Sequence, residues 1–216
     1  MLDNWTKIFD QLIADPQLHG RWLATLSHLE HCGARKISSF IPYLGGKLDL
    51  LQHAAEESRH AFFFLNQLRK LGFKKSDTPP LLGGPTGKRY LYKLDTWISK
   101  ELKNTLKYEG RELKEASYYL VTYVIERRAE SLYPLYESRL RHWSSPISLA
   151  AIIKEEEQHL KEIEETIKQR PSIKPICEKA LLYEKELFRR LSLSIEEELI
   201  ELQSLKGHDG LRAATS

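Results

Sequence analysis

Apolar residues recur at three- and four-residue steps along most of this chain, and no stretch shows the sustained alternation of a half-buried strand. The pattern predicts helices separated by short breaks that contain proline or glycine. We expect helices over residues 3–14, 17–39, 47–71, 91–109, 110–141, 146–170 and 175–205. Because short connections make neighbouring helices antiparallel, the predicted fold class is an all-α bundle.

Proline and glycine mark the predicted helix ends. Pro42 and the pair Gly45-Gly46 should end the second helix, and Gly72 is a natural stop for the third. Residues 73–88 hold three prolines and three glycines, which predicts the longest loop. Ser145 followed by Pro146 is typical of a helix start, with serine as the cap and proline at the first helical position.

Length and composition favour one globular domain. The chain has 216 residues, of which 41% are hydrophobic, so it can bury a sizeable core. We assign residues 1–205 to a single helical domain and residues 206–216 to a flexible C-terminal tail, because the tail lacks an apolar period. No run of 18 apolar residues predicts a membrane span, and the N-terminal segment does not resemble a secretory signal.

Charge and cysteine content exclude several classes of protein. A net charge of +3, from 33 basic and 30 acidic residues mixed along the chain, does not indicate a nucleic-acid partner. Cys32 and Cys177 are far apart, which argues against a disulfide scaffold, a zinc ribbon or a rubredoxin-type iron site. A reducing cytoplasm is therefore the expected location.

A Glu-x-x-His spacing occurs twice on apolar helix faces. Glu57 and His60 form the first pair, and Glu156 and His159 form the second. Three residues along a helix return a side chain to nearly the same face, so each pair can offer a carboxylate and an imidazole to one point. One such pair alone is a weak signal, since a short motif of common residues also arises by chance.

The helices preceding these pairs strengthen the signal. Each carries a glutamate on its own inward face, Glu30 in one case and Glu126 in the other. Four ionised carboxylates in an apolar bundle would repel one another strongly unless cations compensated them. A dinuclear metal centre would supply that compensation. Counting residues from the helix ends places Glu30 level with Glu57, whereas it places Glu130 rather than Glu126 level with Glu156, so this choice stays open.

The order Glu, Glu-x-x-His, Glu, Glu-x-x-His on four helices with one long crossover resembles the ferritin-like di-iron carboxylate superfamily over about residues 17–170. The resemblance implies a ferritin-like four-helix bundle, with residues 72–110 as an enlarged crossover and extra helices at both ends. It implies that Glu57 and Glu156 bridge two metals. The resemblance also favours Glu126 over Glu130, since Glu130 would lie closer to Glu156 than the family usually shows. The implied ligands are Glu30, Glu57, His60, Glu126, Glu156 and His159.

Oxygen-rich ligands with two imidazoles suit iron first and manganese second. The plainer interpretation is that these residues lie on charged surfaces, and the acidic run 155–157 is of the kind that is usually solvated. His53, one turn before Glu57, is either a further ligand, a hydrogen-bond partner of one, or a packed residue. The tyrosines between residues 118 and 136 are expected to pack in the core rather than to act as redox groups. We assign Cys32 no role.

The superfamily includes iron storage, peroxide reduction, radical generation and oxygenation, and the fold does not choose among them. Missing paired cysteines disfavour a classical rubrerythrin, and the enlarged crossover disfavours a storage ferritin. The stretches VIERRAESLYPLYE and IIKEEEQHL resemble aldehyde-deformylating oxygenases, and IERR is similar to a segment of tRNA-hydroxylating di-iron enzymes. These resemblances imply an oxidoreductase with two iron ions that uses O2 as co-substrate to oxidise an organic substrate.

The substrate, small or macromolecular, is not readable from the sequence. An oxygenase of this kind implies a reductase or another electron donor as partner, and a homodimer is left open. Two alternatives have different consequences. A ferroxidase or metal-handling protein predicts a polar path to the centre instead of an apolar cavity. A non-catalytic helical interaction protein predicts that no metal binds or stabilises the fold.

Overall fold

The structure of the protein is a computed structural model that describes the backbone of residues 2–44 and 48–213, with side chains described for residues 4–43 and 48–205. Within these residues it contains seven α-helices, three short helical segments and no strand. The prediction of an all-α fold is confirmed. The α-helices are α1 (Leu2–Ala14), α2 (Pro16–Leu44), α3 (Leu48–Gln67), α4 (Gly84–Glu101), α5 (Gly110–His142), α6 (Ala150–Lys168) and α7 (Lys174–Ala213).

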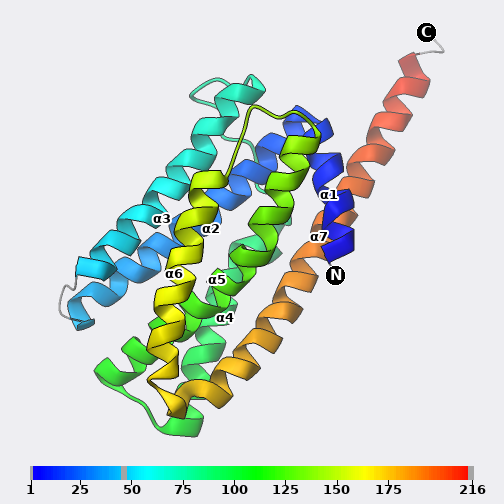
Figure 1. The fold of residues 1–216 in the computed structure, drawn as a ribbon. Helices are drawn as coiled ribbons and strands as arrows, with labels where there is room; N and C mark the ends of the chain where they lie inside the picture. The colour runs from blue at the N-terminus through cyan, green and yellow to red at the C-terminus, as the bar shows by residue number, and fades with distance from the viewer. Residues whose placement is uncertain (1, 45–47, 214–216) are drawn as a thin grey trace.

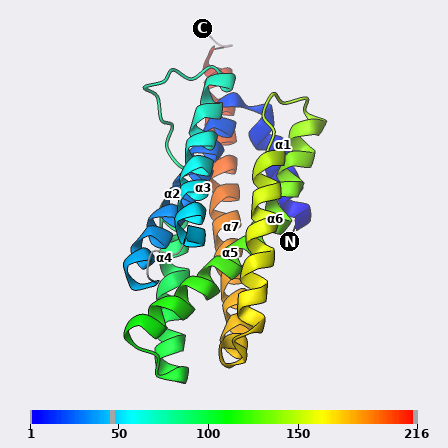
Figure 2. The same cartoon turned by 60° about the vertical axis from the view of Figure 1, so that its left-hand side comes forward.

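Three pairs of helices lie side by side: α2 with α3, α5 with α6, and α4 with α7 (Figure 1). Helix α5 also contacts α2 and α4, and α1 packs on α2 and α5. A second view shows α7 running along the bundle beside α5 (Figure 2). Among the described residues, no helix combines the length and the apolar composition that a membrane crossing requires.

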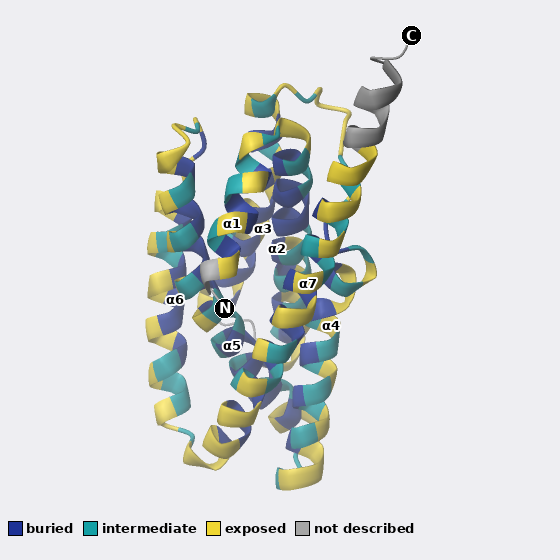
Figure 3. Cartoon of the chain, turned by 90° about the vertical axis from the view of Figure 1, so that its right-hand side faces the viewer, coloured by how far each residue is buried: buried dark blue, intermediate teal, exposed yellow. Residues whose placement is uncertain are grey.

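Two apolar clusters fill the interior, and buried residues face inward on every helix (Figure 3). In the larger cluster the ring of Trp5 lies 5.4 Å from that of Trp22 and 5.0 Å from that of Phe188, measured between centroids. The smaller cluster lies around Phe40 and Leu50. On α2 and α3 the residues of the two clusters occupy opposite ends of the helices, so the inward positions between them can hold a polar layer.

Helix α2 continues through Pro42, so the predicted break at this proline is wrong. Proline removes one backbone N–H and its ring crowds the preceding turn. Near a helix end that cost is small, because water can reach the carbonyl group left without a partner, and Pro42 is exposed. The predicted break at Gly45-Gly46 lies outside the described residues.

The predicted enlarged crossover contains one helix, α4, flanked by the short segments η1 (Leu68–Leu71) and η2 (Leu102–Leu106). Gly72 ends η1 in the left-handed conformation, with a φ angle of 87°, as the sequence predicts. The loop before α4 is fixed by Arg21, whose guanidinium donates to the carbonyl oxygens of Pro80 and Leu81 at 3.1 Å each. These contacts hold α4 against α2.

Helix α6 begins at Ala150, four residues later than the predicted start at Pro146. The hydroxyl of Ser145 instead accepts a hydrogen bond from the Ile147 N–H within the connection. The buried carboxylate of Glu137 accepts from the Leu149 N–H at 2.7 Å and from the Ser148 hydroxyl at 3.0 Å. Burial alone would raise the pKa of Glu137, but these bonds and the one from Arg141 lower it below its ordinary value of 4.5.

A third short segment, η3 (Pro171–Ile173), joins α6 to α7. The backbone of α7 is helical to Ala213, whereas the sequence predicts the last helix to end near residue 205. The division of the chain into one domain over residues 1–205 and a tail over residues 206–216 stays a prediction.

We predict that Glu137→Ala lowers the free energy of unfolding by about 2–3 kcal/mol, because it removes a charged acceptor from a buried backbone N–H. Because the pKa of Glu137 is lowered in the folded protein, this stabilisation is present above pH 4.5 and is lost as pH falls further. Urea denaturation at pH 7 and below pH 4 measures both effects. The exposed Glu130→Ala is the control and should change stability by less than about 0.5 kcal/mol.

Candidate metal centre

All six predicted ligands lie in the interior of the bundle, and none has more than 8% of its surface exposed. They come from four helices: Glu30 from α2, Glu57 and His60 from α3, Glu126 from α5, and Glu156 and His159 from α6. The two candidate glutamates on α5, Glu126 and Glu130, differ in burial. Glu126 is buried among the other five residues, whereas Glu130 is half exposed at the surface and pairs with Arg127.

The side chains form two groups that share one residue. One group contains His53, Glu57, Glu126 and His159, and the other contains Glu30, Glu57, His60 and Glu156, with one ligand atom of each member within 4.8 Å of the others in its group. Glu57 belongs to both groups. The two oxygens of Glu156 point to different histidines, since Oε1 lies 3.0 Å from Nδ1 of His60 and Oε2 lies 3.4 Å from Nδ1 of His159. Glu57 and Glu156 therefore occupy the positions expected of bridging carboxylates.

The two histidines are oriented by carboxylates from the opposite helix. Nε2 of His60 on α3 lies 2.7 Å from Glu155 on α6, and Nε2 of His159 on α6 lies 2.8 Å from Glu56 on α3. These hydrogen bonds help to lower the pKa of Glu155 and Glu56, although burial acts in the opposite direction. Ionised carboxylates only accept hydrogen bonds, so Nε2 of each histidine is the donor.

This arrangement leaves Nδ1 of both His60 and His159 buried and without a hydrogen-bond partner. Oε2 of Glu126 is likewise buried and without a hydrogen-bond partner. Buried polar atoms without partners are uncommon and call for an explanation such as an ion. In metal proteins a ligand histidine typically donates its second ring N–H to a carboxylate, which fixes the ring and presents the other nitrogen to the metal. The residues present therefore fit a metal centre.

The sequence analysis assigned no role to Glu56 or Glu155, left the role of His53 open, and expected the tyrosines to pack in the core. A detectable signal was the repeated Glu-Glu-x-x-His at residues 56–60 and 155–159, in which the first glutamate serves the histidine across the bundle. Nε2 of His53 lies 3.2 Å from Glu57 and 3.5 Å from Glu126, and its Nδ1 lies 3.0 Å from the Tyr118 hydroxyl. His53 is therefore placed as a seventh donor.

Tyr133 is the other tyrosine that reaches the cluster. Its buried hydroxyl donates a hydrogen bond to Glu30. Burial raises the pKa of Tyr133 well above its ordinary value, and the neighbouring carboxylates raise it further, so the phenol keeps its proton. Tyr133 thus holds the Glu30 carboxylate in place from the α5 side.

The carboxylates have strongly perturbed acidities. Burial, followed by the charges of neighbouring carboxylates, raises the pKa of Glu30 and Glu126 well above the ordinary value. Burial would do the same to Glu156, but the nearby imidazoles of His159 and His60 hold its pKa well below that value. Burial opposes protonation of His159, yet the nearby carboxylates of Glu156 and Glu56 raise its pKa to about 9.

A glycine on α2 leaves room for the carboxylate of Glu57. A Cβ atom at Gly33 would lie 3.1 Å from Oε2 of Glu57, tighter than ordinary van der Waals contact. Any larger residue there would push the Glu57 carboxylate away from α2 and from Glu30. The glycine lowers helix propensity by about 1 kcal/mol relative to alanine, so the sequence accepts a local penalty at the point where the carboxylate needs room.

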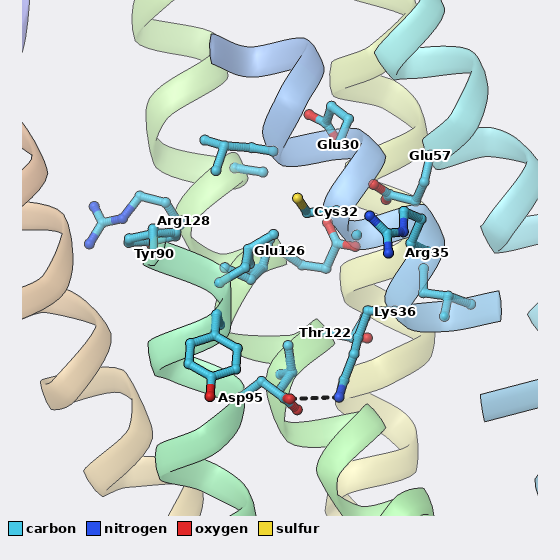
Figure 4. Close-up of a pocket in the computed structure, with 18 of the residues that line it drawn as sticks. Glu30, Cys32, Arg35, Lys36, Glu57, Tyr90, Asp95, Thr122, Glu126 and Arg128 are labelled. Carbon is cyan, nitrogen blue, oxygen red and sulfur yellow. Dashed lines mark hydrogen bonds and ion pairs between the residues drawn. The ribbon is translucent and has the colours of Figure 1, made fainter. Parts of the chain in front are cut away.

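Two cavities reach the cluster. The first, of about 430 Å³, lies between α2, α4 and α5, with the carboxylates of Glu30, Glu57 and Glu126 around one part of it (Figure 4). Its remaining lining is mostly aliphatic and aromatic, and it includes Cys32, to which the sequence analysis assigned no role. The second cavity, of about 520 Å³, lies between α3, α5 and α6. Its lining contains no lysine or arginine. It contains five carboxylates, those of Asp49, Glu56, Glu155, Glu162 and Glu165.

Comparisons of this chain with protein-family models, with curated proteins and with solved structures gave no match. The structure itself shows a helical protein with a buried cluster of glutamates and histidines that could hold a metal ion.

We predict that Glu56→Gln and Glu155→Gln each weaken metal binding by roughly 10- to 100-fold, because each leaves one ligand histidine without its ionised acceptor. Competition with a chromophoric chelator measures the affinity. Glu157→Gln is the matched control, since Glu157 is the exposed neighbour of Glu156 on the same helix, and it should leave the affinity unchanged. Equal affinities in all three variants would contradict the role of the outer carboxylates.

Proposed function

We propose that this protein is a ferritin-like di-iron carboxylate oxidoreductase that uses O2 to oxidise an organic substrate. The observation that carries the proposal is the pair of buried histidines whose Nδ1 atoms lack partners, face buried carboxylates, and are held from behind by Glu56 and Glu155. Four buried glutamates match the charge of two divalent cations. The helix order of the four ligand-bearing segments agrees with the superfamily pattern.

Iron is the first choice of metal and manganese the second. Carboxylate oxygens are hard ligands and imidazole nitrogens are borderline, a combination that suits both ions and disfavours copper(I). When bound, a reduced iron pair supplies the electrons that activate O2. Turnover then requires an external electron donor, so we propose a reductase or an equivalent reductant as partner.

The chain's own residues would divide the remaining tasks. Glu57 and Glu156 would hold both metals, and the outer carboxylates would keep the imidazole rings in one orientation. Tyr133 fixes Glu30, and Tyr118 fixes His53. The apolar walls of the first cavity would exclude water and place an organic substrate against Glu30, Glu57 and Glu126.

A metal-handling function is the second candidate, and the acidic cavity favours it. Five carboxylates on one path to His53 and His159 would attract cations, which is what a ferroxidase requires. A metal-handling function does not require an apolar cavity at the same centre. We therefore rank the metal-handling function below the oxidoreductase. Uptake of iron well beyond two ions per chain would favour the second candidate.

We predict that Glu57→Ala and His159→Ala abolish metal loading while the far-ultraviolet circular dichroism keeps its helical form. Each variant removes a donor at the centre of the cluster, whereas the bundle retains both apolar clusters. Elemental analysis after anaerobic reconstitution with iron(II) measures the loading. Glu130→Ala, half exposed and one turn from Glu126, is the control and should load fully. Full occupancy in either ligand variant would sink the assignment.

A further inference from the structure

The first cavity, between α2, α4 and α5, extends along much of α2. Its lining residues on α2 extend from Trp22 to Phe40, which corresponds to about 27 Å at about 1.5 Å per residue. A volume of about 430 Å³ spread over such a length leaves room for an extended chain better than for a wide ring system. The end near α7 is lined by the buried apolar residues Trp22, Phe188 and Leu191, with the guanidinium of Arg128 over the Phe188 ring.

The mouth of this cavity lies where its lining residues are exposed. These are Arg35 and Ser39 on α2 and Lys88 and Tyr92 on α4. The walls are joined by an ion pair in which Nζ of Lys36 lies 2.6 Å from Asp95 (Figure 4). Because this pair has no net charge, the net charge of the mouth is determined by the other residues.

Two cations at the mouth are without partners. Within the described residues, neither Arg35 nor Lys88 makes an ion pair or a hydrogen bond. Arg128, the remaining cation in the lining, is already held by Glu184 through two bonds of 2.8 Å. The mouth therefore carries net positive charge, in contrast to the all-acidic second cavity, and it favours an anionic group.

The interior does not favour an anionic group. In the proposed centre the charges of Glu30, Glu57 and Glu126 are balanced by the metal ions, and most of the remaining lining is apolar, so an anionic group that moved inward would leave the unpaired cations of the mouth without gaining a charged partner. A ligand with one anionic end and an apolar chain satisfies both conditions, with its charged end at the mouth and its chain along the carboxylate cluster.

We propose that this cavity binds an extended aliphatic monocarboxylate, with the carboxylate at Arg35 and Lys88 and the chain between α2, α4 and α5. The proposal rests on the function proposed above, because it names the substrate class of the same centre. It places methylene carbons, and not the carboxylate, against the metal ligands.

Isothermal titration calorimetry tests the proposal with three probes that share one chain length: decanoate, decanol and decyltrimethylammonium. Each is titrated below its micelle concentration into the protein as purified and again after chelator treatment. We expect decanoate to bind most tightly and decyltrimethylammonium most weakly. Equal affinities, tighter binding of the cation, or no binding of decanoate would overturn the proposal.

Variants locate the binding site. Arg35→Gln and Lys88→Gln should each weaken decanoate binding by up to roughly fivefold, the range for an exposed charge pair, and leave decanol binding unchanged. Arg89→Gln, an exposed neighbour on α4 that does not line the cavity, is the matched control. Leu91→Trp, which fills the cavity from its half-buried wall, should abolish binding of both probes while circular dichroism stays helical.

Failure of this proposal and failure of the metal centre are separable. Decanoate affinity in chelated protein does not depend on metal, and metal content does not depend on decanoate. Normal iron loading with no preference for decanoate would overturn only the substrate class. Decanoate binding without iron loading would overturn only the proposed oxidoreductase.

Discussion

Burial of four carboxylates at one level of the bundle is the constraint on which the rest of this structure depends. Two unit charges at about 4 Å repel by about 4 kcal/mol at an effective dielectric constant of about 20, and several such pairs meet between Glu30, Glu57, Glu126 and Glu156. The neighbouring charges that shift the pKa of Glu30 and Glu126 are those of other carboxylates, and they raise it. Protons or metal ions must supply the compensating positive charge, and the unpartnered Nδ1 atoms of the histidines favour metal ions.

The surroundings of the cluster differ on its two sides. Towards α2 and α4 the cavity is apolar and opens between unpaired cations, whereas towards α3 and α6 it is polar and acidic. His53, Tyr118 and Thr122 line both cavities, so they lie at the boundary between them. Such a division would let cations approach from one side and an anionic, largely apolar molecule from the other, without either ligand crossing the path of the other.

Much of the helix pattern and the position of the buried glutamates and histidines could be predicted from the sequence, because helical periodicity places residues on faces independently of tertiary contacts. The height of each residue along the bundle axis could not be predicted in this way. Counting from the helix ends favoured Glu130 because it assumed a short turn, but α6 begins only at Ala150 and residues 143–149 run back along the bundle before it (Figure 1). The pairing of Glu56 and Glu155 with histidines across the bundle also depends on tertiary packing, since neither partner is near in sequence.

Anomalous diffraction at the iron edge, from crystals of the protein reconstituted with iron(II), tests the metal centre most directly. We expect two peaks per chain, both lying between Glu57 and Glu156, one beside Nδ1 of His60 and the other beside Nδ1 of His159. A chain with no internal peak, or with peaks only at surface carboxylates, would contradict the assignment of this cluster as a dinuclear centre.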